Sequence, residues 1–360
     1  MTTTENLQRP PAELRWAEDL ARLRAGDTAP RPPGWALSID AAKRFIVGDP
    51  ALGIERKFVG DASLIDRALV SLATTRGLLL TGEPGTAKSL LSELLSAAVS
   101  SDSTLTIQGG AATTEDQIRY GWNYALLVSE GPSHRSIVPA PMLRGIREGK
   151  IVRFEELTRC PLEVQDSILS LLSDRVLAVP ELSEMVYAVD GFNVIATANT
   201  RDRGVNDMSA ALKRRFNFET VFPIPDLRTE LALVESEATA LLARSGVPEV
   251  PPRDVLEVLV TTFRELRSGA TDAGDSLDRM SAVMSTAEAV SVAHAVGLRG
   301  WYLRGEPGNA ADIVECLAGT AAKDNPDDLA RLRRYLEQQV PRKSGRVWKA
   351  LHDARFQLPG

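Results

Sequence analysis

The chain has 360 residues, of which 44% are hydrophobic, so it is long enough for two domains with filled cores. Its 42 Lys and Arg residues against 48 Asp and Glu residues give a net charge of −6, which argues against a protein devoted to coating nucleic acid. No apolar run approaches the length of a membrane span, and no signal pattern opens the chain, so we expect a cytoplasmic protein without a membrane span. The two cysteines lie far apart and indicate neither a zinc site nor a disulfide framework.

The pattern of residues along the chain divides it into three parts. Residues 1–35 hold five prolines around one charged amphipathic stretch, which predicts an N-terminal extension with a single helix and a Pro-rich linker. Over 36–225, strand-like and helix-like segments alternate, as in the parallel sheet of an α/β domain. Over 226–360 the pattern is helical only, with a basic C-terminal extension. We therefore expect an α/β fold with an αβα core, followed by an all-helical domain.

Five segments of the α/β part are predicted to be strands, and one is predicted to be a hairpin. The strands are expected over 78–81, 104–108, 151–154, 192–198 and 217–222, with an irregular insert between the second and the third. The hairpin is expected over 175–190, between a helix and the fourth strand. In the helical part, apolar residues at spacings of three and four predict helices over 227–245, 252–267, 278–296 and 312–322.

A Gly-rich segment between the first strand and the next helix is the most informative motif of the chain. Its order of strand, loop, Lys-Ser and helix is the context of a phosphate-binding P-loop, with Ala87 where a second glycine is usual. Backbone N–H groups would cradle a nucleotide's phosphates, Lys88 would reach the β- and γ-phosphates, and the Ser89 hydroxyl would bind Mg²⁺. ATP and Mg²⁺ are the predicted cofactors. The candidate nucleotide-binding residues are Gly82, Glu83, Pro84, Gly85, Thr86, Ala87, Lys88, Ser89 and Leu90.

Two adjacent acids end the third predicted strand. Glu155 and Glu156 would lie at the carboxyl edge of the sheet, where ligands of open α/β sheets bind. We expect Glu155 to help to hold Mg²⁺ and Glu156 to polarise the attacking water. Glu155 stands where Asp is usual. Two acids that merely cap a strand are the alternative interpretation.

Two further segments carry polar groups that fit the same site. Asn199 ends the fourth strand and could hydrogen-bond the γ-phosphate and the lytic water. Arg214 and Arg215 end a short helix, from which an arginine could reach a phosphate in a neighbouring subunit. A surface arginine that pairs with a nearby acid is the alternative.

The order of these motifs resembles that of an AAA+ ATPase, and in particular the MoxR family, over about residues 55–300. The family pattern implies phosphate binding by Lys88, metal binding by Ser89 and Glu155, hydrolysis by Glu156, γ-phosphate sensing by Asn199, and a trans-acting finger from Arg215, with Arg214 as substitute. It also implies a homo-oligomeric ring, hexameric in form, and a client or adaptor protein, often one with a von Willebrand factor A domain. One element departs, since the lid helix where an arginine is usual has none, and Arg279 is only a weak substitute.

The resemblance implies a chaperone-like motor that remodels or matures a partner, including by metal-cofactor insertion. Two alternatives stay open. One is an AAA+ motor on nucleic acid, favoured by eight basic residues between Arg331 and Arg355 but opposed by the net charge. The other is a slow nucleotide-dependent switch or scaffold, favoured by Glu155 and by the missing lid arginine.

Overall fold

The computed structural model describes residues 7–199, 208–323 and 325–358, and the chain forms two compact units within it. The first unit comprises Met1–Gly82 and Ala87–Phe222, and the second comprises Pro223–Gly360 with the loop residues Glu83–Thr86. The first six residues of the expected N-terminal extension and the last two of the C-terminal one lie outside the described residues. Each unit has a hydrophobic core, so each is described by itself.

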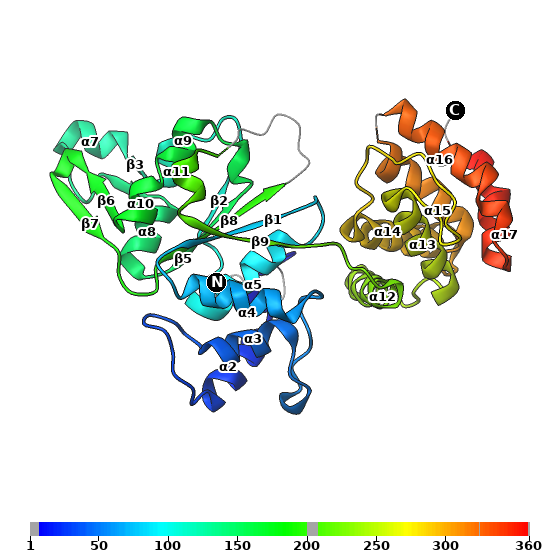
Figure 1. The fold of residues 1–360 in the computed structure, drawn as a ribbon, viewed down its shortest axis with the longest axis horizontal. Coiled ribbons are helices and arrows are strands. Elements are labelled where there is room, and N and C mark those ends of the chain that lie inside the picture. The colour runs from blue at the N-terminus through cyan, green and yellow to red at the C-terminus, as the bar shows by residue number, and fades with distance from the viewer. Residues whose placement is uncertain (1–6, 200–207, 324, 359–360) are drawn as a thin grey trace. The chain divides into compact units, whose positions relative to one another are not determined.

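A five-stranded parallel sheet forms the centre of the first unit (Figure 1). Its order is β2-β5-β8-β1-β9, so the chain crosses over between non-adjacent strands. The strands are β1 (Gly77–Gly82), β2 (Thr106–Gln108), β5 (Ile151–Glu155), β8 (Asn193–Asn199) and β9 (Phe216–Thr220). All five predicted strands, and the predicted α/β fold class, are confirmed.

The three central strands, β5, β8 and β1, are buried on both faces of the sheet, because alternate residues of each enter different cores. Leu78 and Leu80 pack with one helix layer, whereas Leu79 packs with the other. The first layer holds α3 (Ile39–Val47), α4 (Ala62–Leu72) and α5 (Lys88–Ser100). The second holds α6 (Glu115–Ile118), α8 (Pro141–Glu148), α9 (Leu162–Asp166), α10 (Leu169–Ser173) and α11 (Ala210–Lys213).

The N-terminal stretch contains two helices where the sequence predicts one. They are α1 (Ala12–Arg15) and α2 (Ala17–Gly26), and the chain departs from helical geometry at Trp16 between them. Ala12, Leu20 and Leu23 are buried and join the core on the α5 side of the sheet. The stretch is therefore not a strand of the sheet, but it packs against the layer that covers the sheet.

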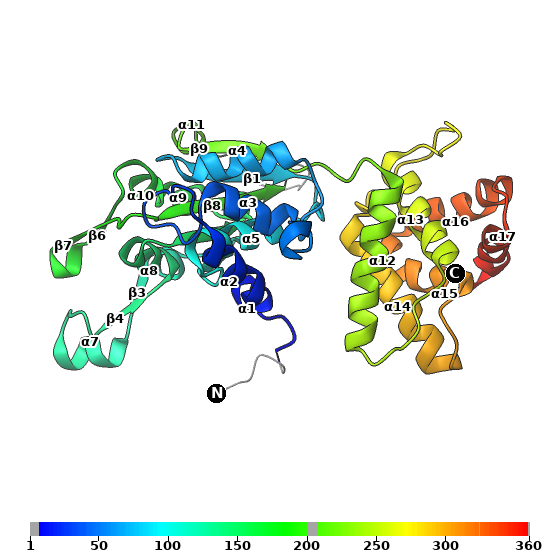
Figure 2. The same cartoon turned by 90° about the horizontal axis from the view of Figure 1, so that it is seen from below.

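The insert between β2 and β5 is more regular than predicted (Figure 2). Strands β3 (Tyr120–Trp122) and β4 (Ile137–Pro139) pair antiparallel, and α7 (Tyr124–Glu130) connects them. Strands of three residues are too short to show a period in the sequence, which is why the prediction failed here. The hairpin predicted over 175–190 is confirmed as β6 (Val176–Val179) and β7 (Glu184–Tyr187).

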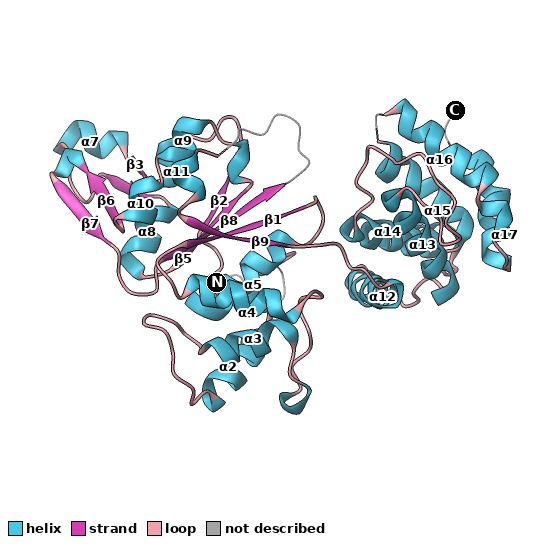
Figure 3. Ribbon diagram, viewed as in Figure 1, coloured by secondary structure: helices cyan, strands magenta, loops and turns pink. Residues whose placement is uncertain are grey.

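The second unit is built from helices and loops (Figure 3). The predictions for α12 (Leu227–Arg244), α13 (Arg253–Ser268) and α15 (Ala310–Leu317) are confirmed within a few residues. The helix predicted over 278–296 starts only at Thr286, because Ser285 caps α14 (Thr286–Arg304) in a capping box with Glu288. After a π-helical turn at Ala318–Ala322, the basic stretch forms α16 (Pro326–Gln338) and α17 (Arg346–Asp353).

Candidate functional site

The strand before the P-loop, β1, lies next to β8, which ends in Asn199. Strand β8 in turn lies next to β5, which ends in Glu155. Gly82 at the end of β1 stands opposite Asn199 of β8, and Phe154 of β5 stands opposite Ala196 of β8. Because all three strands run parallel, their carboxyl ends meet at one edge, as the sequence predicts. Gly82, Glu155 and Asn199 therefore lie at the same edge of the sheet.

The loop after β1 leads directly into α5, whose first residue is Lys88. Lys88 is 6% exposed, and its Nζ donates to the carbonyl of Gly82 at 3.2 Å. Thr86 Oγ1 donates to the Glu83 carbonyl at 2.9 Å. The ammonium group is thus held beside the start of its own loop, where a bound phosphate would lie in a P-loop.

Ala87 adopts a left-handed backbone conformation with φ 64° and ψ 26°. This region is disfavoured for a residue with a Cβ atom by roughly 1–2 kcal/mol, and glycine adopts it without that penalty. The left-handed backbone angle at this position therefore explains why glycine is usual there. The methyl group of Ala87 is accommodated, but at a cost in free energy that the size of the side chain alone does not reveal.

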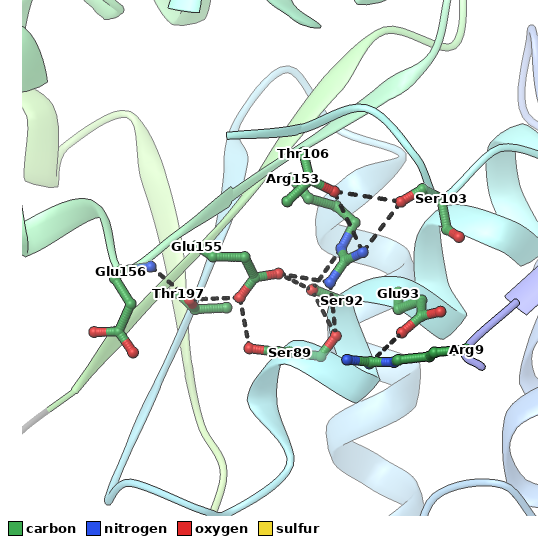
Figure 4. A network of polar contacts seen from close by, with 10 residues as sticks. All are labelled: Arg9, Ser89, Ser92, Glu93, Ser103, Thr106, Arg153, Glu155, Glu156 and Thr197. Carbon is green, nitrogen blue, oxygen red and sulfur yellow. Dashed lines mark hydrogen bonds and ion pairs between the residues drawn. The ribbon is translucent and has the colours of Figure 1, made fainter. Parts of the chain in front are cut away.

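Glu155 is the centre of a buried polar network (Figure 4). It is 4% exposed, and four groups donate to its carboxylate. Ser89 Oγ and Thr197 Oγ1 donate to Oε2 at 2.7 and 2.8 Å. Ser92 Oγ and the Arg153 guanidinium donate to Oε1 at 2.6 and 2.8 Å. Burial opposes ionisation, but the charge of Arg153 and the three hydroxyls outweigh it and hold the pKa of Glu155 below its ordinary value.

Glu156 follows the strand in a left-handed conformation, with φ 58°, and its side chain lies apart from that of Glu155. Asn199 Nδ2 donates to both carboxylate oxygens of Glu156, at 2.8 and 2.9 Å. Arg159 Nε lies 3.3 Å from Oε2, and the backbone N–H of Glu156 donates to Thr197 Oγ1 at 3.0 Å. The two adjacent acids thus have separate partners, with Glu155 buried in the sheet and Glu156 held at its edge.

The donor set at Ser89 and Glu155 fits a hard divalent cation such as Mg²⁺. Both side chains offer oxygen, and Mg²⁺ in nucleotide sites is held by one or two protein oxygens together with phosphates and water. Among the described residues no group of three or more His, Cys, Asp or Glu side chains could hold a metal by itself. While Ser89 donates its proton to Glu155, its oxygen lone pairs remain for a metal, so Glu155 orients this ligand.

The two predicted finger arginines differ in their surroundings. Arg215 is half-buried, and its Nε donates to Ser173 Oγ at 2.8 Å at the end of α10. Arg214 is exposed at the C-cap of α11. The contact with Ser173 fixes the direction of the Arg215 guanidinium.

Three members of this site were missed in the sequence, namely Arg153, Ser92 and Thr197. Arg153 lies in a segment whose apolar residues predict a strand, and a charged residue in a strand buried on both faces is unusual. It lies two positions before Glu155, so both side chains point to the α5 face. That spacing could have predicted the pair, because a buried charge needs a partner.

Two family models match the chain, one over each unit. Residues 77–216 match the AAA domain of the dynein-related subfamily, and residues 228–359 match the C-terminal domain of YehL-like AAA+ ATPases. YehL of Escherichia coli K12 is 60% identical over 357 residues, which cover 98% of each chain. The chain belongs to the YehL family of AAA+ ATPases. A Staphylococcus aureus USA300 protein is 27% identical over 157 residues, which cover 43% of this chain and 59% of that protein.

The fold of this YehL-family chain is also found in solved structures. NtrX from Brucella abortus has a TM-score of 0.51 at 15% identity, over 83% of this chain and 64% of that chain. NtrX in complex with ADP has a TM-score of 0.50 at 13% identity over the same shares. At such low identity the likeness is one of fold alone. Family membership makes the chain an ATPase of the AAA+ class that binds ATP. Among the described residues, no helix is both long and apolar enough to cross a bilayer.

Proposed function

We propose that the chain is a MoxR-type AAA+ motor that hydrolyses ATP, with Mg²⁺, to remodel or mature a partner protein in the cytoplasm. The observation that carries the proposal is the held carboxylate of Glu156. Asn199 donates to both of its oxygens at the edge of the sheet where the P-loop strand ends. A fixed carboxylate beside a phosphate loop is what a general base for water requires.

Each residue of the site has a proposed role. Lys88 binds the β- and γ-phosphates, together with the backbone of residues 82–90. Ser89 holds Mg²⁺, oriented by Glu155, and the metal would supply charge to the transferred phosphoryl group. Glu156 accepts a proton from the attacking water, and Asn199 holds the Glu156 carboxylate and senses the γ-phosphate. The division into an extension over 1–35, an ATPase core over 36–225 and a helical lid over 226–360 is part of the proposal.

Arg215 is proposed to act on the ATP site of a neighbouring subunit in a homo-oligomeric, hexameric ring. The Ser173 contact holds its guanidinium in one direction, which lowers the cost of ordering it at a neighbour's phosphate. An arginine finger contributes about 10³–10⁵ to the rate of phosphoryl transfer. Arg214, next to it, is the alternative finger, and Arg279 remains the weak substitute for the usual lid arginine.

The ring is tested by mixing two inactive variants. Arg215→Ala should bind ATP without hydrolysing it, and Lys88→Ala should not bind ATP. In mixed rings some intact sites face an intact arginine, so turnover should partly return. Turnover that neither depends on protein concentration nor returns on mixing would contradict the ring. The parallel mixture with Arg214→Ala shows which arginine acts.

The proposed partner is a client or adaptor protein. A client or adaptor with a von Willebrand factor A domain is what the MoxR resemblance implies. Glu156→Gln loaded with ATP should retain its partner in a pull-down from native extract, whereas Lys88→Ala should not. Equal recovery with both variants would contradict ATP-dependent engagement.

The basic C-terminal stretch gives little support to the nucleic-acid alternative. Four of its members pair with acids of the same unit: Arg331 with Asp328, Arg334 with Asp278, Arg342 with Asp275 and Lys343 with Glu265. Basic side chains that pair with acids in this way are less available to bind the phosphates of a nucleic acid. Salt-sensitive DNA binding at physiological ionic strength would revive this alternative.

The slow-switch alternative has one observation in its favour. The carboxylate of Glu155 already receives four hydrogen bonds, one of them from a cation. It is therefore a weaker partner for a divalent metal than an unpaired acid would be. Steady-state turnover distinguishes a motor from a switch, because a motor hydrolyses ATP repeatedly within the lifetime of one client complex.

A further inference from the structure

We infer that Arg153 is a positioning residue that makes nucleotide binding at this P-loop less dependent on Mg²⁺. The inference rests on the proposed nucleotide site at residues 82–90. Arg153 is a cation in a buried strand of the sheet. Arg153 is 8% exposed, and it lies on the central part of β5.

The guanidinium of Arg153 joins three segments of the first unit (Figure 4). Its Nη2 donates to the Ser89 carbonyl at 3.0 Å and to Glu155 Oε1 at 2.8 Å. Its Nε donates to Ser92 Oγ at 2.9 Å, and its Nη1 donates to the Ser103 carbonyl at 3.1 Å. The first turn of α5, the chain before β2 and the end of β5 are therefore fixed to one planar group.

This arrangement positions the candidate metal ligand. Ser89 is held twice, since its carbonyl accepts from Arg153 and its hydroxyl donates to Glu155. Ser92, one turn later, accepts from Arg153 and donates to the same carboxylate. A planar guanidinium with five donors can satisfy this many acceptors, whereas a lysine ammonium has three donors and no fixed plane.

The charge of the cluster is as important as its geometry. An apolar strand that ends in a single buried acid would place one uncompensated negative charge behind Ser89. Here the ion pair of Arg153 and Glu155 makes the cluster neutral. Nucleotide phosphates are anions, so a neutral cluster repels them less than a negative one when no divalent cation is present.

Two consequences follow for ligand binding. A nucleotide should still bind, with reduced affinity, when Mg²⁺ is removed. Loss of the arginine charge should make the affinity fall further when Mg²⁺ is removed. The unpaired carboxylate of Glu155 would then repel the phosphates and attract the metal.

The test is equilibrium binding of ADP by calorimetry, in saturating MgCl₂ and in EDTA, with the full chain. The quantity compared is the ratio of the dissociation constant in EDTA to that in MgCl₂. For Arg153→Met, this ratio should be at least about tenfold higher than for the wild type. Arg153→Lys keeps the charge and should keep the wild-type ratio, although it should lower the melting temperature. Arg67→Met is the matched control, because it breaks the pair of the exposed Arg67 with Glu219 in the same unit and should leave the ratio unchanged.

Variants of Glu155 keep the inference testable if Arg153→Met does not fold. Glu155→Gln leaves the arginine charge uncompensated, so its ratio should fall below that of the wild type. Arg153→Met combined with Glu155→Gln makes the cluster neutral again, so its ratio should rise above that of Glu155→Gln alone.

Two outcomes separate this inference from the proposed site. A folded Arg153→Met or Glu155→Gln variant with the wild-type ratio would overturn the role of Arg153. Lys88→Ala should lose ADP affinity in both buffers, and full affinity there would overturn the P-loop site itself.

Discussion

Two buried carboxylates are held in closely similar ways, one in each unit. In the first unit Glu155 accepts from Arg153 and from the hydroxyls of Ser89, Ser92 and Thr197. In the second, the fully buried Glu230 of α12 pairs with Arg264 at 2.7 Å and Arg267 at 2.9 Å, and it accepts from Thr286 Oγ1 at 2.6 Å. In both networks, cations and hydroxyls keep the pKa of a buried acid below its ordinary value.

The two networks differ in the segments that they join. The Glu230 network ties α12 to α13 and to the start of α14, and Arg264 also donates to the carbonyls of Ile224 and Pro225. All of these segments are structural parts of the second unit. The Glu155 network includes Ser89, the second residue of the P-loop helix. The same kind of network therefore stabilises the fold in the second unit and positions the candidate metal ligand Ser89 in the first. The two roles differ because the networks join different segments.

Of the changes at the two adjacent acids, the largest effect is expected at Glu156, beside the Glu155 network, and it should have no counterpart in the second unit. Glu156→Gln should bind ATP normally but hydrolyse it about 10²–10⁴-fold more slowly, because an amide cannot accept a proton from water. Steady-state phosphate release, with ATP affinity measured separately, checks this. Glu163→Gln, at an exposed acid nearby in the chain, should keep wild-type turnover. Normal turnover by Glu156→Gln would remove the proposed base.

The next effect is one of stability, and it belongs to the second unit. Glu230→Gln should lower the free energy of unfolding of that unit by about 3 kcal/mol, since it leaves two arginines without their buried partner. Hydrogen exchange of α12 and α13 locates the loss. Glu235→Gln, on the same helix but in a surface pair with Arg253 at 3.6 Å, should change the stability by less than about 0.5 kcal/mol. Equal effects of the two variants would mean that burial does not matter here.

The same variant has a defined pH dependence. Because the folded-state pKa of Glu230 is lowered despite its burial, its stabilisation is present above the ordinary carboxyl pKa and is lost as the pH falls through the folded value. Acid unfolding of the second unit should therefore be less steep in Glu230→Gln than in the wild type. An unchanged acid limb, followed by circular dichroism, would show that Glu230 is not the linked group.

Glu155→Asp shows whether the first network is built around the longer glutamate side chain or would accept the aspartate that is usual at this position. The usual Asp at this position predicts equal or faster turnover. The structure predicts the reverse, because a carboxylate one methylene shorter cannot reach four donors that now lie at 2.6–2.8 Å. Loss of one or two charge-assisted hydrogen bonds should lower turnover by about 10- to 100-fold. Unimpaired turnover would show that the site is not built around the longer side chain.

The smallest effect concerns Ala87. Ala87→Gly removes left-handed strain from the P-loop but adds backbone entropy to the unfolded chain, so the free energy of unfolding should rise by no more than about 1 kcal/mol. Ser101→Gly is the control for backbone strain, with φ 55° at the other end of the same helix, and it also removes the exposed hydrogen bond from Arg24 Nη2 to Ser101 Oγ. Ser101→Gly should also change the free energy of unfolding by no more than about 1 kcal/mol. It should leave the nucleotide affinity unchanged, whereas Ala87→Gly should change that affinity. A thermal melt and an ADP titration compare the two.

The sequence predicts the first unit well where its signals are local. The P-loop, the five strands and the two acids at a strand end each follow from a few neighbouring residues. The Glu155 network could not be predicted in full, because Ser92, Thr197 and Arg153 come from three separate elements. The late start of α14 was missed because the apolar spacing over 278–285 continues through residues whose backbone is instead fixed by Asp328, which accepts from the N–H groups of Ser281 and Ala282. Long-range hydrogen bonds of this kind leave no periodic pattern.

The central claim is that the P-loop over residues 82–90 binds the ATP that this AAA+ ATPase hydrolyses. Turnover of ATP by the wild type and by Lys88→Ala, at matched concentration and with matched melting temperatures, tests it most directly. Lys88 is the buried cation of the loop, so the variant should leave the β- and γ-phosphate charge uncompensated and show no measurable ATP binding or turnover. Turnover by a folded Lys88→Ala variant at the wild-type rate would contradict the claim.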